Sequence, residues 1–383
     1  MRLPFAFGAR LLCVLVLSFG MRHDGTARER GPRVEVVCPS PPVPVRVAEH
    51  QVLVYELHIT NFDEVSLTLN RLEVFADTDR AQLLETISGE ALSAMMQVVG
   101  SSEAKDLRTI DSGRRAVVFL WIELGVDARP PIRLRHRMVF TAGKGKASAT
   151  TTLEDFPVPV SQDGTPLLSS PFDGGVWLAG NGPGNDSSHR RSIVAIDGHI
   201  DLAQRFAIDW VKVGPNGDSH HDGTARNENW WGYGEPIRAV ADGEVTQVLD
   251  GIPENTPRVL PTKVTLDNIA GNYLILRIAP NRYVTYAHLQ TGSIKVALHD
   301  HISRGTVIAL LGNTGQATAP HLHLQVTDGN SVLESEGVPF IFAGFTDLGP
   351  GSAYELEKHA SIPRKDSIPG QDEVIDFTMV KKQ

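Results

Sequence analysis

The stretch TAPHLHLQV, residues 318–326, carries two histidines, His321 and His323, inside a run that alternates apolar and polar side chains. On a strand, residues i and i+2 point to the same face, so the two imidazoles would lie side by side. Imidazole is the commonest metal ligand and titrates near neutral pH. The pair therefore predicts a metal site, or one ligand beside one acid–base group. The alternative is a solvated strand face that happens to carry histidines.

Two more residues have the chemistry to complete such a site. His288 lies in the alternating run YVTYAHLQ, and Asp209 lies between apolar neighbours in QRFAIDWV. Burial of an unpaired carboxylate costs several kcal/mol, and a bound cation would offset that cost. We therefore expect Asp209 to be an acidic metal ligand close to the histidines.

The elements that must position these residues are predicted to be strands, which indicates an all-β fold. From residue 33 to 160, alternating runs between turn residues, with little helical periodicity, predict an immunoglobulin-like β-sandwich. The clearest runs are QVLVYELHITNF, SLTLNRLEVF, RAVVFLWIEL and IRLRHRMVF. His50, His58 and His136 are isolated within them, and ordinary strand positions account for all three.

A second domain is expected from 167 to 345, after a proline-rich linker at 155–166. Its segments IRAVADGEVTQV, GNYLILRIAPNRYVTYAHLQ and HISRGTVIALLGNTG each predict a strand, a turn and a strand. The tail from 346 to 383 is polar and contains prolines, which predicts an extended or disordered end.

Composition and charge narrow the class of protein. The chain has 383 residues, 41% of them hydrophobic, and a formal net charge of -9. This length favours two domains, and the negative charge argues against nucleic acid as the main partner. Of two cysteines, only Cys38 lies beyond the N-terminal leader, so neither a disulfide framework nor a cysteine zinc site is expected.

Residues 1–30 have the layout of a signal peptide. Arg2 and Arg10 precede an apolar run over residues 11–19, which is too short for a comfortable membrane span. An uncleaved N-terminal anchor is the alternative, because no A-x-A cleavage site follows. We expect a secreted, periplasmic or cell-envelope protein with no membrane span beyond this possible anchor.

Five motifs follow one another between residues 170 and 345: AVADGEV, GNYLIL, YAHL, GTVIALLGNTG and PHLHL. In this order and spacing the chain resembles the lysostaphin-type or LytM-type zinc metallopeptidases. The resemblance implies an antiparallel β domain with an open groove, one zinc ion per chain and hydrolysis of peptide bonds. It also implies that His323 and Asp209 are zinc ligands, that His321 is the general base and that His288 is its catalytic partner.

One ligand of that family is missing from its usual place. The family has its first histidine ligand four residues before the aspartate, where this chain has Arg205, and a guanidinium cannot bind a cation. A hairpin with the two-residue turn Asp197-Gly198 would return His189 close to this position. His199, at the hairpin tip, would lie about 20 Å away. We therefore predict His189 as the third ligand; a different ligand or a metal-free site is the alternative.

Other histidines and aromatic residues have weaker claims. The second H-x-H pair, His299 and His301, precedes a glycine turn and is predicted to lie in a solvated loop. His220 and His221 fall in a polar insertion, residues 215–236, which we expect to be a loop at the groove rim. Side chains of this insertion that could stack on a substrate are Trp230, Trp231 and Tyr233. The alternative is that they pack the loop onto the domain.

The resemblance implies a zinc metalloendopeptidase whose substrates are peptidoglycan cross-links or stem peptides. Two alternatives remain at this level. Arg205 is the kind of change found in zinc-free members that bind or regulate cell-wall hydrolases. A peptidase that acts on extracellular proteins or peptides has the same catalytic residues, because the loops of the groove set specificity.

Overall fold

The computed structural model describes residues 31–77, 81–100, 106–125, 128–143, 145–215, 217–351 and 360–378. All elements named below belong to one unit, Pro32–Gln383. The predicted signal peptide or anchor, residues 1–30, lies outside the described residues. Among the described residues, no helix has the length and apolar character needed to span a membrane.

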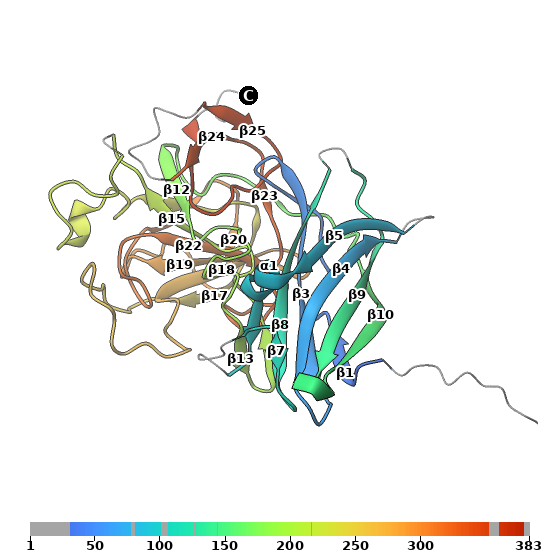
Figure 1. Ribbon diagram of the computed structural model, residues 1–383. Helices are drawn as coiled ribbons and strands as arrows, with labels where there is room; N and C mark the ends of the chain where they lie inside the picture. The colour runs from blue at the N-terminus through green and yellow to red at the C-terminus, as the bar shows by residue number, and fades with distance from the viewer. Residues whose placement is uncertain are drawn as a thin grey trace, which may run out of the picture. The chain divides into compact units, whose positions relative to one another are not determined.

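In the described part of the chain, two five-stranded antiparallel sheets cover the region predicted to be a sandwich (Figure 1). The first sheet has the order β1, β3, β8, β6, with β2 also paired to β3, and the second has the order β10, β9, β4, β5, with β7 paired to β4. We call them the N-terminal sheets. Their elements are β1 Val34–Val37, β2 Val45–Val47, β3 His50–Asn61, β4 Leu67–Ala76, β5 Gln82–Ser88, α1 Gly89–Ala94, β6 Met96–Val98, β7 Thr109–Ile110, β8 Arg115–Leu124, β9 Arg133–Ala142, η1 Gly145–Ala147 and β10 Ala149–Pro159.

Alternation along β3 explains how the N-terminal sheets pack. Leu53, Tyr55 and Leu57 are fully buried and share one hydrophobic core with Leu69 and Val74 of β4. Because residues two apart share a face, this row of β3 is directed at the second sheet. The predicted strands of this region are confirmed, and strand β10 continues to Pro159 through the first part of the expected linker.

The opposite face of β3 is covered as well. Val52 and Val54 belong to the same hydrophobic core as Trp210, a residue of the C-terminal region. Further along this face Glu56 is only 1% exposed. Strand β3 is therefore buried on both faces, and its charged residue needs partners from the region that covers it.

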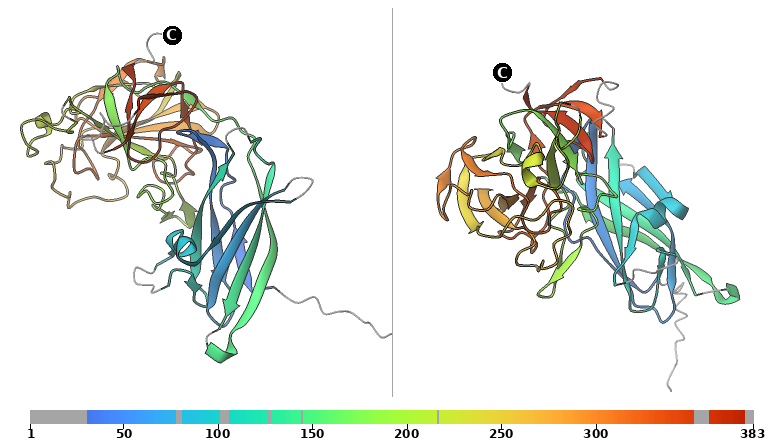
Figure 2. Two further views of the ribbon diagram at one scale, coloured as in Figure 1. Left: turned by 45° about the horizontal axis from the view of Figure 1, so that its top comes forward. Right: turned by 90° about the vertical axis from the view of Figure 1, so that its left-hand side faces the viewer.

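The C-terminal region is organised by a ten-stranded antiparallel sheet within the described residues, seen from two further directions in Figure 2. Its order is β20, β17, β18, β19, β22, β15, β12, β26, β24, β25, and the pairs β11/β23, β13/β14 and β16/β21 lie outside it. The elements are β11 Leu167–Leu168, β12 Val176–Gly180, β13 Val194–Ile196, β14 His199–Asp201, β15 Ile208–Lys212, η2 Asn227–Asn229, β16 Pro236–Arg238, β17 Gly243–Leu249, β18 Asn272–Ala279, β19 Arg282–Leu289, β20 His301–Ile302, β21 Val307–Leu310, β22 Leu322–Thr327, β23 Ile341–Phe342, β24 Phe345–Pro350, β25 Ile362–Arg364 and β26 Glu373–Asp376.

Strand β22, which carries the H-x-H motif, lies between β19 and β15 near the middle of this sheet. Leu322, Leu324 and Val326 alternate into the hydrophobic core. The residues between them therefore face the opposite side of the sheet, where His323 pairs in register with Asp209 of β15. The fold thus brings the two predicted ligands of these strands together.

The C-terminal segment differs from the extended end that its composition predicts. Strand β26 pairs with β12, so that Ile375 is fully buried opposite Trp177. Strands β24 and β25 extend the sheet beyond it. The sequence conceals these strands because they are only three to six residues long, and two of them contain a proline, Pro350 in β24 and Pro363 in β25. The partner of β26, strand β12, also lies about two hundred residues earlier in the chain.

A buried histidine of the N-terminal sheets makes their stability depend on pH. Tyr55 donates its hydroxyl hydrogen bond to Nε2 of His136 at 2.6 Å, and Nδ1 of the same ring donates to the carbonyl of Phe156 at 2.9 Å. Burial lowers the pKa of His136 from 6.5 to about 4. The unfolded chain therefore takes up a proton that the folded chain refuses, and we expect about 3 kcal/mol of stability to disappear as the pH falls from 6.5 to 4.

The measurement is urea unfolding at pH 7 and pH 4 of the protein and of the double variant Tyr55→Phe/His136→Leu. The double variant replaces both side chains by apolar groups, and the Phe156 carbonyl loses its donor equally at both pH values. Its loss of stability between the two pH values should be smaller by about 3 kcal/mol. Equal losses in both proteins would contradict the prediction.

Candidate metal centre

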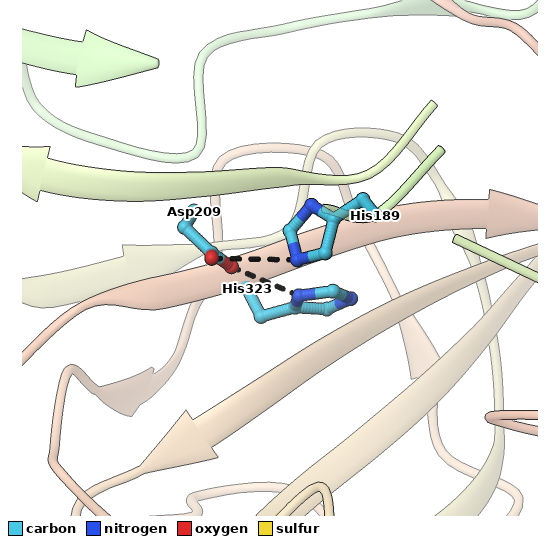
Figure 3. Close-up of side chains that lie close together, drawn as sticks. All are labelled: His189, Asp209 and His323. Atoms are coloured by element: carbon cyan, nitrogen blue, oxygen red, sulfur yellow. Dashed lines mark hydrogen bonds and ion pairs between the residues drawn. The ribbon is translucent and has the colours of Figure 1, made fainter. Parts of the chain in front are cut away.

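Three side chains converge at the middle of the ten-stranded sheet (Figure 3). Nε2 of His189 lies 3.3 Å from Oδ2 of Asp209, and Nδ1 of His323 lies 3.0 Å from Oδ1 of the same carboxylate. The possible ligand atoms of the three residues lie within 4.8 Å of one another. Two imidazole nitrogens and one carboxylate oxygen in this arrangement are a ligand set that zinc accepts in catalytic sites, with a fourth position left for water.

The hairpin that brings in His189 has the register that the sequence predicts. Ile196 pairs with His199 across the turn Asp197-Gly198, and the ladder ends at Val194. Beyond the ladder the two segments stay in contact, because Nδ1 of His189 donates to the carbonyl of Ala207 at 3.3 Å. His189 therefore reaches Asp209 from a loop, while Asp209 and His323 are held on strands.

Outer contacts orient both imidazoles. Nδ1 of His189 also lies 3.0 Å from the carbonyl oxygen of Asn181, which leaves Nε2 directed at Asp209. Nε2 of His323 donates to Oε1 of Gln325 at 3.0 Å, which leaves Nδ1 directed at the same carboxylate. Such second partners fix the tautomer of metal-binding histidines and make them better ligands. The residues present thus fit a zinc ion in tautomer as well as in donor type.

Asn181 and Gln325 were not found by sequence reasoning. Asn181 donates from Nδ2 to Oδ2 of Asp209 at 2.8 Å and accepts a hydrogen bond from Ser188. Gln325 is fully buried and donates to the carbonyl of Val332. The position of Gln325, two residues after His323 on one strand face, was a usable signal. Asn181 is 28 residues from Asp209 and gave no such signal.

His321 and His288 form a second pair of rings beside the three. Nε2 of His321 lies 3.5 Å from Oδ1 of Asp209, and its Nδ1 donates to the carbonyl of Ala319 at 2.8 Å. Nδ1 of His288 donates to the carbonyl of Thr314 at 2.7 Å. The two ring centroids are 4.6 Å apart. In both rings Nδ1 is engaged by a backbone carbonyl, which leaves Nε2 as the atom for acid–base chemistry, and in His321 that atom faces Asp209.

Two glycines explain how His288 is held. The backbone of His288 has φ +61°, a strained conformation for a residue with a side chain, and its N–H donates to the carbonyl of Ala270. Gly271 and Gly315, from the motifs GNYLIL and GNTG, pack backbone against backbone next to this bond, both with positive φ. A side chain at Gly271 would collide with Thr314. These motifs thus build the turn that presents His288.

The protonation states suit a cation. Burial lowers the pKa of His189, and it lowers that of His288 further. Burial also acts to lower the pKa of His321, but the Asp209 carboxylate outweighs it and the pKa is raised. Burial acts to raise the pKa of Asp209, but the neighbouring histidines hold it well below its ordinary value. An ionised carboxylate and a neutral His189 are the forms that bind metal.

A cavity of about 440 Å³ opens over these residues. All five lie on its wall: His189, Asp209, His288, His321 and His323. The other described lining residues are uncharged, and an apolar side is formed by Leu266, Ile269, Val332 and Leu333. The cavity therefore has room for a peptide chain over the histidines. Apart from the five clustered residues, its described wall offers no charged side chain to bind that peptide.

Several residues singled out in the sequence lie elsewhere. Trp230 packs against His220 and Trp231 against His221, and neither they nor Tyr233 are among the residues that line the cavity. Their role in substrate binding stays a prediction.

The other candidate positions are also away from the cluster. His299 is exposed and pairs with Glu244, and His301 is exposed at the start of β20. Arg205 is buried and pairs with Glu56 and Glu336.

Residues 230–334 match the model of Peptidase family M23, so this part of the chain is an M23 peptidase domain. The match contains His288, His321 and His323, and it begins after His189 and Asp209. Peptidases of this family depend on zinc. Among solved structures, the chain is similar to a zinc containing peptidase from Vibrio cholerae. The TM-score is 0.25 at 15% identity, over 72% of this chain and 77% of that one.

Curated relatives match shorter stretches. Peptidoglycan DD-endopeptidase ShyC of Vibrio cholerae is 33% identical over 93 residues, which cover 24% of this chain and 17% of that protein. Lysostaphin of Staphylococcus simulans is 30% identical over 91 residues, 21% of this chain and 18% of that protein. The chain thus spans less than a fifth of these relatives. The catalytic domain of lysostaphin has a TM-score of 0.24 at 18% identity, over 42% of this chain and 86% of that structure.

Proposed function

We propose that the protein is a zinc-dependent metalloendopeptidase that hydrolyses peptide bonds in peptidoglycan cross-links or stem peptides. The observation that carries the proposal is the convergence of His189, Asp209 and His323 beside a second pair of histidines in one cavity. The named activity of the relatives, peptidoglycan DD-endopeptidase, supports the substrate class. The setting we propose is secreted, periplasmic or at the cell envelope.

Each residue has a role that follows from its contacts. Zinc, when held by His189, Asp209 and His323, supplies Lewis-acid polarisation of the scissile carbonyl and lowers the pKa of water. Nε2 of His321 takes the proton of the attacking water, because Nδ1 is already engaged by Ala319. His288 donates from Nδ1 to Thr314, so it assists through Nε2 when that nitrogen carries a proton, by hydrogen-bonding the oxyanion or by protonating the leaving amine.

The convergence also favours a peptidase over a zinc-free regulator. The regulator interpretation depended on Arg205 in the usual ligand position. Arg205 is engaged by Glu56 and Glu336, and His189, the proposed third donor, lies 3.3 Å from the Asp209 carboxylate. A decayed site would not be expected to keep all five chemical groups in one cavity.

The test begins with the purified protein, its zinc content by elemental mass spectrometry and its action on isolated peptidoglycan. We expect one zinc per chain and the release of new peptide amines. Both should be abolished by 1,10-phenanthroline and restored by added zinc. Absence of zinc even after reconstitution would contradict the peptidase proposal and favour a zinc-free regulator. Zinc-dependent cleavage of denatured proteins, with peptidoglycan left intact, would show that the substrate class is wrong.

A further inference from the structure

Four charged side chains are buried where strand β3 meets the segments that carry His189 and Asp209. Arg190 is fully buried, Glu56 is 1% exposed and Arg205 is 3% exposed; Glu336 is partly buried at the edge of the cluster. Buried charges persist in proteins when they are paired and hydrogen-bonded. The pairing pattern therefore shows which segments depend on one another.

Glu56 of the N-terminal sheets is the centre of the cluster. Its carboxylate accepts hydrogen bonds from Nε of Arg205 at 3.1 Å and from Nη2 of Arg205 at 2.7 Å. It also forms an ion pair with Nη1 of Arg190. Arg205 has a second carboxylate partner, Glu336, and donates to the carbonyl of Gly337 at 2.8 Å. Among the described residues, Glu56 is the one carboxylate that pairs with Arg190.

Arg190 ties the loop of His189 to the N-terminal sheets. Its Nη2 donates to the carbonyl of Tyr55 at 2.9 Å and lies 3.3 Å from the carbonyl of Leu120, and its guanidinium lies over the ring of Phe119. Partners on β3 and β8 thus surround this side chain. Its Cα is one peptide unit, about 3.8 Å, from that of His189. A displacement of the Arg190 backbone therefore moves His189 as well.

The chemistry of the cluster makes Glu56 critical for this loop. Without Glu56 the guanidinium of Arg190 is left in a dry site with only neutral carbonyl partners. A buried charge that loses its partner is strongly unfavourable, and the guanidinium relieves it by moving toward water. Arg205 is less affected, because Glu336 remains beside it. Removal of Glu56 is therefore expected to disturb mainly the segment that carries Arg190 and His189.

We propose that Glu56 is a positioning residue for the metal centre, which holds His189 at ligand distance through Arg190. The inference rests on the proposed function in one respect, that His189 is a zinc ligand. The N-terminal sheets then have a defined role: they complete the metal site of the peptidase domain from outside it. Separation of the sheets from this domain weakens metal binding.

The test measures the zinc dissociation constant of the whole protein by competition with a chromophoric chelator. Glu56→Gln, which keeps the shape but removes the charge, is expected to bind zinc about 10–100-fold more weakly. The visible spectrum of the cobalt-loaded variant should change as well, because one ligand is displaced. Leu57→Ala is the matched control, since Leu57 is the next residue of β3 but lies in the core between the N-terminal sheets. It should destabilise the protein and leave zinc affinity unchanged.

A second variant tests whether the effect passes through Arg190. Arg190→Gln alone should weaken zinc binding to a similar extent, and the double variant Glu56→Gln/Arg190→Gln should be no weaker than Arg190→Gln. Glu336→Gln, which touches Arg205 but not Arg190, should stay close to the wild type. Wild-type zinc affinity in Glu56→Gln, or an equal loss in Leu57→Ala, overturns the inference alone. A wild-type protein that binds no zinc overturns the proposed function together with it.

Discussion

Replacing His189 by alanine is expected to release zinc from the protein and to abolish hydrolysis. His189 is one of the three proposed ligands, and its Nε2 lies 3.3 Å from the Asp209 carboxylate. Loss of a ligand should cost more than the roughly 10–100-fold in affinity that the loss of an outer contact costs. The removal also leaves Asp209 and His323 as a two-ligand site, which does not hold zinc at the concentrations used for purification. Elemental mass spectrometry and chelator competition measure both consequences.

His199 provides the matched control for His189. It belongs to the same hairpin and is exposed at the tip, where it pairs in register with Ile196. His199→Ala should keep one zinc per chain and full activity. Stoichiometric zinc in His189→Ala would contradict the assignment and direct attention to His321, the other imidazole near Asp209.

The position of His189 could be predicted because the required information is local. The turn Asp197-Gly198 fixes the register of the hairpin, and a strand register is a count of residues along two known segments. Likewise, the strand period places His321, His323 and Gln325 in fixed relation to one another. Local rules of this kind predict which side chains share a face or a hairpin position, but not the distances between them.

The partners of Glu56 could not be predicted from the same rules. In the sequence, apolar and polar residues alternate along part of β3. This pattern is typical of a strand with one face in a core and the other in water. Its second face is covered by residues more than a hundred positions away, and Arg205 pairs with Glu56 across 149 residues. The same limit hid strand β26, whose partner β12 lies at the start of the domain. Charge at a strand position indicates exposure only when nothing else covers the strand.

Arg205 departs from the family pattern, and residues far away in the sequence explain why an arginine is found there. In isolation, an arginine at a ligand position indicates a lost metal site. In the structure, its guanidinium is held by Glu56, Glu336 and the carbonyl of Gly337. The residue is therefore accounted for by the contact between the N-terminal sheets and the C-terminal region. The proposed third ligand, His189, and the buried contact of Arg205 therefore lie on the two sides of one hairpin.

Replacing His321 by alanine is expected to separate catalysis from metal binding. The variant keeps His189, Asp209 and His323, so one zinc per chain should remain. Without a base to take the proton of the attacking water, kcat should fall by about 10²–10⁴-fold. KM should change little, since the uncharged walls of the cavity are intact. Hydrolysis of isolated peptidoglycan, with zinc content determined on the same sample, measures both quantities.

His301→Ala is the control for this experiment, because His301 belongs to the other H-x-H pair and is exposed on β20. It should match the wild type in zinc content and rate. His288→Ala should resemble His321→Ala, with zinc kept and kcat reduced, because His288 is the proposed catalytic partner of His321 and the two ring centroids are 4.6 Å apart. If His321→Ala instead loses zinc with its activity, His321 is a ligand rather than the base. If it keeps both, the proton is taken by another group, and His288 is the nearest imidazole able to do so.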